Sequence, residues 1–511
     1  MLRSTISLGL SAGVLGGLLI APPAQAADSH IDEAIDALPG IVEQMQQRTG
    51  VPGIAVAVVH NDKVVYSHGF GVRSVTTKEP VTTDTVFQLA SVSKPLGAAV
   101  VAAAVGKGKL KWEDPVRKFL PDFKLSDRYV TRKATVADMY SHRSGLPGLV
   151  GNELESYGFS RNTIIKRLRY APLSPFRISY SYSNFGLTTG GEAAAEAAGT
   201  TWEKLADKMI FNPLGMKHTS YRHKDYVARK NRATLHQQSG SGTWITSERE
   251  PDAQAPAGGA SSTVLDMAKW LRMELATGKF DGKRVVKAGP LREARSLQIR
   301  TSAAADDATK VSGYALGIDT GTDTTGRVRW THSGAFSAGA ATRIMMIPDL
   351  DLGLVVLTNG WPIGVPEAIV ESFADVAETG AVTKDWLAVF KPAFAPFTTP
   401  NRTVNGKPRP ANPKPAAALS RYVGTYRNEY TGTAKVSTQG KRLVLHLGPE
   451  KHGLVLPLRH WSGDVFSYRA VNSQHSVMPP GFISGVTFDL KRGTLQLEES
   501  EGDLGLLNRV G

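Results

Sequence analysis

The chain has 511 residues, of which 41% are apolar and 21% charged, and it contains no cysteine. This length suits more than one globular domain, and the lack of cysteine excludes a disulfide scaffold, a cysteine nucleophile and thiolate metal or iron–sulfur sites. The formal charge of +14 favours association with anionic cell-envelope polymers, whereas the absence of any run of five Lys or Arg argues against a nucleic-acid partner.

Residues 1–26 have the features of a secretory signal peptide. Arg3 precedes an apolar stretch over residues 6–21, and Ala24-Gln25-Ala26 is a small-x-small cleavage pattern. Glycines and a Pro-Pro pair make this stretch a poor membrane-spanning helix. We therefore expect cleavage after Ala26 and a periplasmic or secreted protein without stable membrane insertion.

Residues 27–398 combine strand and helix patterns. Two hairpins are expected near its ends, over 53–66 and 342–357. The predicted helices between them cover 95–105, 186–198, 202–209 and 263–276. Strands at both ends with helices between predict an α+β fold, in which one antiparallel sheet is assembled from both ends of the domain and helices pack on it.

A proline-rich stretch over residues 399–417 predicts a semi-rigid linker. Behind it, residues 418–511 contain short β-rich runs separated by turn signals. These runs cover 422–426, 441–447, 454–456, 465–468, 485–490 and 494–497. Evenly spaced short strands without helices predict a small all-β barrel domain.

The strongest chemical signal is Ser91-Val92-Ser93-Lys94, which opens an alanine-rich helix. If Ser91 lies at the helix start, Lys94 follows one turn later and its amine can reach the serine hydroxyl. A helix N-terminus also offers free backbone N–H groups to an anion that forms there. Ser91 is therefore a candidate nucleophile; the alternative is that it only caps the helix.

A nucleophilic serine needs a proton acceptor and an oxyanion hole. Tyr182-Ser183-Asn184, just before a predicted helix, offers Tyr182 as the acceptor. An ammonium about 4 Å away contributes roughly 4 kcal/mol at an effective dielectric of ~20, enough to lower a tyrosine pKa from ~10 toward 7. Lys94 alone would then suffice to make Tyr182 a base; the alternative is a packed surface tyrosine.

A third pattern, His332-Ser333-Gly334-Ala335, precedes the second predicted hairpin. It would place a polar side chain and a free backbone N–H along an edge strand, although an ordinary strand histidine fits it too. The similarly spaced Lys287-Ala288-Gly289 is followed by Pro290, which has no N–H to offer an oxyanion. His332 is therefore favoured.

In order and spacing, these three patterns resemble the motifs of the class C β-lactamase and penicillin-binding-protein superfamily, whose S-x-x-K element carries the serine. Residues 141–147 and 256–263 support the resemblance, which covers about residues 40–380. Residues 418–511 resemble the lipocalin-like domain found on some of these hydrolases. The resemblance implies a serine hydrolase domain over 27–398.

The resemblance also implies a role for each motif residue. Ser91 would be acylated, Lys94 and Tyr182 would act as the base pair, and the backbone N–H groups of Ser91 and Ala335 would form the oxyanion hole. The residues implied to bind substrate are Asn184, His332, Ser333 and Gly334.

One departure affects the expected substrate. β-Lactamases and transpeptidases of this superfamily usually carry Lys where this chain has His332, and histidine is mostly neutral near pH 7. A neutral side chain at this position would not hold a substrate carboxylate by charge. We expect a small ester, amide or peptide substrate rather than an antibiotic lactam.

Two other hydrolase classes are disfavoured. Residues 335–339 approach the G-x-S-x-G elbow, but with Ala in place of the first Gly and without a βαβ pattern. None of the 12 histidines forms His-x-His or His-Glu-x-x-His, so neither a metal nor another cofactor is expected. A catalytically silent binding protein on the same scaffold and a true β-lactamase or D,D-peptidase stay open, as does the oligomeric state.

Overall fold

The computed structural model describes residues 25–239, 241–301, 312–322, 326–399, 401–469, 481–500 and 502–510. The expected signal peptide, residues 1–26, lies outside these residues except for its last two positions, so its cleavage stays a prediction. Among the described helices, none is both long and apolar enough to cross a membrane.

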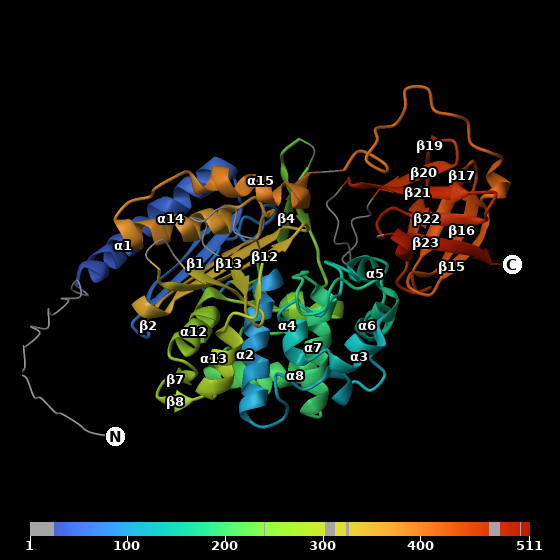
Figure 1. Cartoon of the computed structure of the whole chain (residues 1–511). Coiled ribbons are helices and arrows are strands. Elements are labelled where there is room, and N and C mark those ends of the chain that lie inside the picture. Colours follow the sequence, from blue (N-terminus) through green and yellow to red (C-terminus); the bar gives the residue numbers. More distant parts are fainter. Residues whose placement is uncertain are drawn as a thin grey trace, which may run out of the picture.

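The centre of the larger part of the molecule is an eight-stranded antiparallel sheet (Figure 1). Its strands, in spatial order, are β2 (Lys63–Gly71), β1 (Gly53–His60), β14 (Leu352–Thr358), β13 (Ala340–Ile347), β12 (Val328–Phe336), β11 (Asp319–Thr322), β10 (Gly313–Tyr314) and β9 (Ile299–Arg300). Both expected hairpins are present, and β1 pairs with β14 along its length. The expected α+β fold, with a sheet assembled from both ends of the domain, is confirmed.

The sheet is covered on both faces (Figure 1). In β1, Ile54 and Val56 contact the core beneath α1 (Gln25–Thr49) and α14 (Val365–Thr379), whereas Ala55 and Ala57 face the helices on the other side. Because successive strand side chains point to opposite faces, burial of both faces makes the strand a continuous apolar run. A further helix, α15 (Trp386–Thr398), packs against α14.

The second face carries the helices that surround the candidate site. The helices on this side are α2 (Ser93–Gly106), α3 (Arg128–Lys133), α4 (Val136–Tyr140), α5 (Asn152–Ser156), α6 (Arg161–Arg167), α7 (Asn184–Ala197), α8 (Trp202–Ala206), α9 (Asn212–Leu214), α10 (His223–Val227), α11 (Ala255–Gly258), α12 (Val264–Leu275) and α13 (Ala288–Arg295). All four expected helices are present, and the one expected over 202–209 is α8 followed by a π-helical turn, Asp207–Phe211. Short two-stranded ribbons complete this part: β3 (Phe87–Gln88) with β6 (Ser261–Ser262), β4 (Leu235–Gln238) with β5 (Trp244–Ser247), and β7 (Lys279–Phe280) with β8 (Lys283–Arg284).

Nine antiparallel strands form a nearly closed barrel in the C-terminal part. They are β15 (Gly424–Asn428), β16 (Gly432–Gln439), β17 (Arg442–Leu447), β18 (Leu454–Pro457), β19 (Arg459–Ser462), β20 (Val465–Arg469), β21 (Ile483–Asp489), β22 (Thr494–Leu497) and β23 (Leu506–Val510). The sequence patterns miss β16, β19 and β23. In β16 only the small Ala434 and Val436 point inward between polar neighbours, so its apolar signal is weak.

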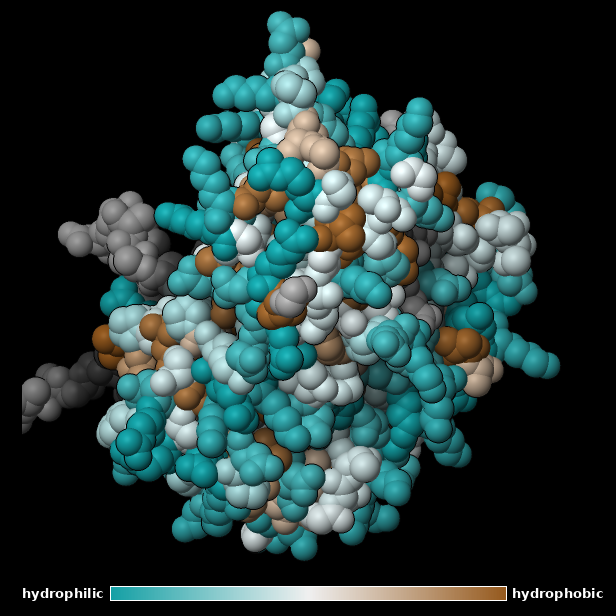
Figure 2. Space-filling view, turned by 90° about the vertical axis from the view of Figure 1, so that its right-hand side faces the viewer, coloured by the Kyte–Doolittle hydropathy of each residue, from teal (hydrophilic) through white to brown (hydrophobic). Residues whose placement is uncertain are grey.

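The barrel lies beside the helical layer, and polar contacts join the two (Figure 1). Arg167 of α6 donates to the carbonyl oxygen of Thr431 at 3.0 Å, and the amide of Gly151 donates to the Tyr430 hydroxyl at 3.0 Å. Seen from the barrel side, hydrophilic side chains cover most of the surface, with apolar side chains gathered mainly in its upper half (Figure 2). The extents of the linker over 399–417 and of its flanking domains stay predictions.

Candidate active site

Ser91 lies in a tight turn between strand β3 and helix α2. Ala90 has a φ of +47°, and residues 90–92 form a 3₁₀ turn before α2 begins at Ser93. The residue that caps α2 is Val92, without a side-chain capping hydrogen bond, so Ser91 is not a helix cap. Instead, its Oγ lies 2.9 Å from Nζ of Lys94, one turn away as the spacing predicts.

Lys94 is completely buried, and its Nζ also donates to the carbonyl oxygen of Ala257 at 2.9 Å. Burial lowers the pKa of Lys94 well below its usual value, against a smaller opposing effect of Asp319. A neutral amine in this position can accept the hydroxyl proton of Ser91. The structure therefore makes Lys94 the better proton acceptor of the expected pair.

Tyr182 lies beside Ser91 and Lys94. Its ring centroid is 4.6 Å from Lys94 Nζ, and its hydroxyl hydrogen-bonds to Ser91. The expected fall of its pKa toward 7 is wrong, because burial raises the pKa of Tyr182 above its ordinary value and Asp319 adds to the increase. The phenol thus keeps its proton near neutral pH and can donate it or pass it on.

The third motif runs along β12, against the turn that carries Ser91. A Cβ atom at Gly334 would lie 2.3 Å from both Leu89 O and Thr342 Oγ1, and 3.0 Å from Ser91 N. Only glycine lets this strand approach the nucleophile so closely. Ala335 follows on the same strand, so both expected oxyanion donors lie in this wall of the site; their role stays a prediction.

His332 is almost fully buried. Its Nδ1 lies 2.7 Å from the carbonyl oxygen of Ser333, and its Nε2 lies 2.9 Å from the hydroxyl of Tyr314. Burial, followed by the charge of Lys94, lowers the pKa of His332 to about 3. A neutral imidazole in this place provides no positive charge for a substrate carboxylate. Its rival Lys287 precedes helix α13 and is not on a strand.

Asn184 opens helix α7 directly after the Tyr182 loop. Its Nδ2 donates to Asn152 Oδ1 at 3.3 Å, while its buried Oδ1 has no hydrogen-bond partner in the described part of the chain. Ser91, Tyr182, Asn184, His332, Ser333 and Ala335 all line one cavity of about 850 Å³. The structure thus brings the expected site residues together around one cavity.

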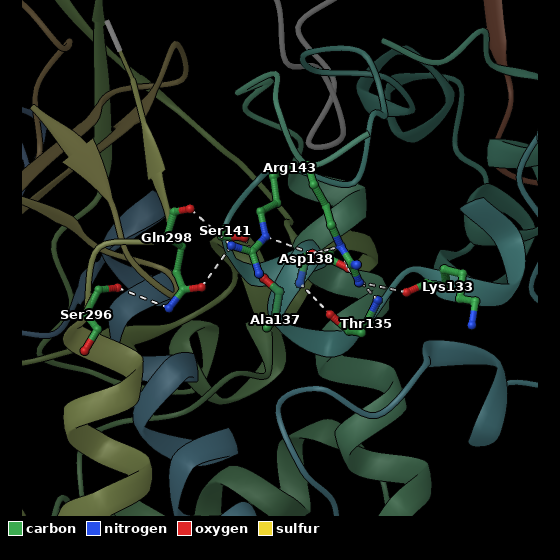
Figure 3. Close-up of polar contacts among 9 residues, drawn as sticks. Lys133, Thr135, Ala137, Asp138, Ser141, Arg143, Ser296 and Gln298 are labelled. Atoms are coloured by element: carbon green, nitrogen blue, oxygen red, sulfur yellow. Dashed lines mark hydrogen bonds and ion pairs between the residues drawn. The ribbon is translucent and has the colours of Figure 1, made fainter. Parts of the chain in front are cut away.

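The loop beneath the site is held by a buried carboxylate (Figure 3). Asp138 of α4 forms ion pairs with Arg143 at 2.8 Å and Arg177 at 2.9 Å, and it also caps α4 with Thr135. Burial opposes ionisation, but the hydrogen bonds from Arg177, Thr135 and Arg143 hold the pKa of Asp138 below its ordinary value. Arg143 also donates to the side chain of Gln298, which ties this loop to the segment before β9.

Several residues that contact the site were not predicted to act in it. His142, known from the sequence only as part of a supporting segment, accepts a hydrogen bond from Ser183 N at 3.1 Å and fixes the Tyr182 loop. Asp319, Glu153 and Glu499 line the cavity but belong to no motif. They come from three distant segments, so no local pattern could have identified them.

No group of three or more metal-binding side chains occurs among the described residues.

Residues 335–339, the elbow-like segment, join β12 to β13. The strand is therefore followed by another strand, whereas a nucleophile elbow leads into a helix. The α/β-hydrolase interpretation is thus excluded by the local structure.

Comparison with protein families gives two matches. A family model described as "Beta-lactamase" matches residues 38–374, and one described as "Domain of unknown function (DUF3471)" matches residues 408–500. The second match falls in the region of the barrel.

Individual proteins are also similar. The chain is 29% identical over 262 residues to Beta-lactamase-like protein 2 of Dictyostelium discoideum, covering 49% of this chain and 46% of that relative. It is 25% identical over 477 residues to the Unguisins hydrolase ungD of Aspergillus violaceofuscus (84% of this chain, 82% of the relative), and 25% identical over 356 residues to a beta-lactamase of Escherichia coli (65% and 90%). The match thus spans under half of the first relative and most of the other two.

Two solved structures share the fold. A penicillin-binding protein homologue from Pyrococcus abyssi, described as octameric, aligns with a TM-score of 0.61 at 20% identity, over 93% of this chain and 99% of that one. A class C beta lactamase from Rhodobacter sphaeroides aligns with a TM-score of 0.55 at 21% identity, over 68% and 99%.

Proposed function

Given that the chain belongs to the beta-lactamase family, we propose that it is an exported serine hydrolase that cleaves an ester or amide bond through an acyl-enzyme on Ser91. The observation that carries this proposal is the 2.9 Å distance between Ser91 Oγ and the Nζ of a completely buried Lys94. The relative described as a hydrolase, similar over most of both chains, supports the same reaction class.

The first half-reaction follows from the protonation states. Neutral Lys94 accepts the proton of Ser91 as Oγ attacks the substrate carbonyl, and the backbone N–H groups of Ser91 and Ala335 receive the developing oxyanion. As the tetrahedral intermediate collapses, the bond to the leaving alcohol or amine breaks. The leaving atom takes a proton from the Tyr182 hydroxyl, which is replenished from the Lys94 ammonium.

The second half-reaction uses the same groups in reverse. A water molecule loses its proton toward the neutral Lys94 through Tyr182 and attacks the acyl carbonyl. Ser91 leaves with a proton, the carboxylic acid is released and the starting state is restored. Because Tyr182 begins and ends as a phenol, its raised pKa is compatible with this relay.

The decisive experiment labels the folded protein with a fluorophosphonate probe and maps the modified peptide. We expect the label on Ser91, its loss in Ser91→Ala and its retention in Ser337→Ala, a second serine in the cavity wall. Acyl-enzyme trapping with p-nitrophenyl esters, D- and L-aminoacyl amides and nitrocefin then defines the substrate class. Folded protein that takes no label would favour a silent binding protein instead.

A further inference from the structure

The cavity that holds the proposed catalytic residues is shared by segments that are far apart in the sequence. Ser91 and Tyr182 line it together with apolar side chains from a loop, a helix and the barrel region. These side chains are Leu149 of the loop before α5, Phe394 and Phe397 of α15, and Phe482 and Leu504 of the C-terminal part. A ligand that fills this space therefore meets apolar groups in the same cavity as the nucleophile.

Two aromatic side chains of α15 are not used to build the core. Leu387 is the buried residue of this helix, whereas Phe394 is half-buried and Phe397 is 39% exposed. The centroids of the two phenylalanine rings are 6.0 Å apart, and both side chains line the cavity. Exposed aromatic surface in such a place is typical of contact with a ligand.

Leu149 combines an unusual backbone conformation with an exposed apolar side chain. Its φ is +62°, in the left-handed region that bulky residues rarely adopt, and the residue is 54% exposed. Glycine or asparagine would suit this backbone better, and a polar side chain would suit water better. Neither the conformation nor the exposure stabilises the fold, so this position points to contact with a ligand.

Hydrogen bonds tie the loop of Leu149 both to the proposed proton relay and to the barrel. The N–H of Leu149 donates to the carbonyl oxygen of Tyr182 at 2.9 Å, and its carbonyl oxygen accepts from Asn152 N at 3.1 Å. Two residues further on, the N–H of Gly151 donates to the hydroxyl of Tyr430 of the barrel at 3.0 Å. The backbone of Leu149 is thus fixed beside Tyr182.

We propose that Leu149, the aromatic pair of α15 and the apolar side chains of the barrel region bind an apolar arm of the substrate, and that Leu149 is a specificity-determining residue for that arm. The inference rests on the proposed function and narrows its substrates to esters or amides with an alkyl or aryl chain beside the cleaved bond. It also gives the barrel a direct part in substrate recognition.

Chain-length series test the preference on each side of the cleaved bond. Burial of one methylene group is worth about 0.8 kcal/mol, or about fourfold, so four further methylenes that are even partly buried should raise kcat/KM at least about tenfold. The acyl side is tested with p-nitrophenyl hexanoate against p-nitrophenyl acetate, and the alcohol side with hexyl acetate against ethyl acetate. A preference of this size in either series supports the proposal and identifies the side that carries the arm, whereas no preference in both series overturns it.

Leu149→Asn tests the role of the residue itself. Asparagine is close to leucine in shape and tolerates the left-handed conformation, so the loop and the unfolding temperature should be preserved. The long-to-short ratio of kcat/KM should fall at least about fivefold, because a polar amide replaces apolar surface. The matched control is Leu297→Asn, the same change at a residue that is 57% exposed and is not among the described lining residues. An unchanged ratio in Leu149→Asn, or an equal fall in the control, would overturn the proposal.

Phe397→Ser is an independent variant at the α15 side of the cavity and should lower the same ratio. A wild-type ratio in this variant would remove α15 from the proposed arm site.

Binding separates this inference from the proposed function. N-phenyl-1-naphthylamine, a neutral apolar fluorescent probe, should bind saturably to full-length Ser91→Ala protein, and at least about fivefold more weakly when Leu149→Asn is added. Leu149-dependent binding of the probe without Ser91-dependent hydrolysis in the wild type would remove the proposed function and leave the apolar site standing. Ser91-dependent hydrolysis without chain-length preference or Leu149-dependent binding would do the reverse.

Discussion

Replacing Gly334 by alanine places a methyl group in the narrowest contact between β12 and the nucleophile turn. The new Cβ would lie 2.3 Å from Leu89 O and from Thr342 Oγ1, two atoms that are joined by a hydrogen bond of 2.7 Å. Carbon–oxygen contacts under 3.0 Å are essentially never seen, so one side must retreat by about 0.7 Å, the difference between 3.0 and 2.3 Å. Neither oxygen belongs to a long flexible side chain that could swing away.

The retreat separates β12, with the N–H of Ala335, from Ser91. A displacement of about 1 Å at a reacting centre costs about 10²-fold, and loss of one oxyanion donor costs about 10²–10³-fold. We therefore expect kcat/KM of Gly334→Ala to fall about 10²-fold, which corresponds to ~2.7 kcal/mol of transition-state stabilisation. The global fold should persist, because overpacking of this kind costs about 1–3 kcal/mol of stability.

The assay compares ester hydrolysis and thermal unfolding of Gly334→Ala with those of Gly321→Ala. Gly321 lies in β11 of the same sheet, and a Cβ there meets no atom of the described residues within 4 Å. The control should therefore keep its activity. Wild-type kcat/KM in Gly334→Ala, with the fold intact, would refute the view that β12 must approach the nucleophile this closely.

Lys94→Ala and Tyr182→Phe should each lower kcat by about 10²–10⁴-fold in folded protein, because each removes a member of the proton relay; wild-type-like turnover would remove that residue from the mechanism. Asp319 raises the pKa of Lys94 through its charge, so Asp319→Asn should move the acidic limb of the kcat/KM pH profile to lower pH; an unmoved limb, or a shift to higher pH, contradicts this reasoning. Glu274→Gln should destabilise the fold by about 3–5 kcal/mol in denaturant unfolding, because it strands the buried guanidinium of Arg295. Replacing both Glu274 and Arg295 by methionine should recover much of the lost stability. A Glu274→Gln variant as stable as wild type would contradict the expectation that breaking this buried ion pair is destabilising.

The sequence predicted the sheet and the contact between Ser91 and Lys94 because their signals are local, whereas the meeting of the three motifs in one site was implied by the family resemblance. Ser91 and Lys94 are one helical turn apart, and the two hairpins show their turns and apolar strands directly. The pKa of Tyr182 could not be predicted from spacing alone. It depends on burial, which the whole surrounding structure creates and which here exceeds the effect of neighbouring charges.

Residues without a motif were also beyond sequence reasoning. Glu153 and Glu499 are 346 positions apart and line the same cavity only because the barrel packs on the helical layer. The strand β16 escaped detection for a different reason: its inward positions carry small side chains, so it buries little apolar surface.

The residues proposed to cleave the substrate and some of the residues that line the rest of the cavity lie in different parts of the chain. In the proposed mechanism, bond cleavage depends on atoms of the larger domain, whereas Phe482, Glu499 and Leu504 belong to the C-terminal part. Exchange of the barrel between related chains would therefore alter which molecules are admitted without disturbing the nucleophile or its relay. Such a division lets new specificities arise by recombination of gene segments, with the reaction chemistry inherited intact.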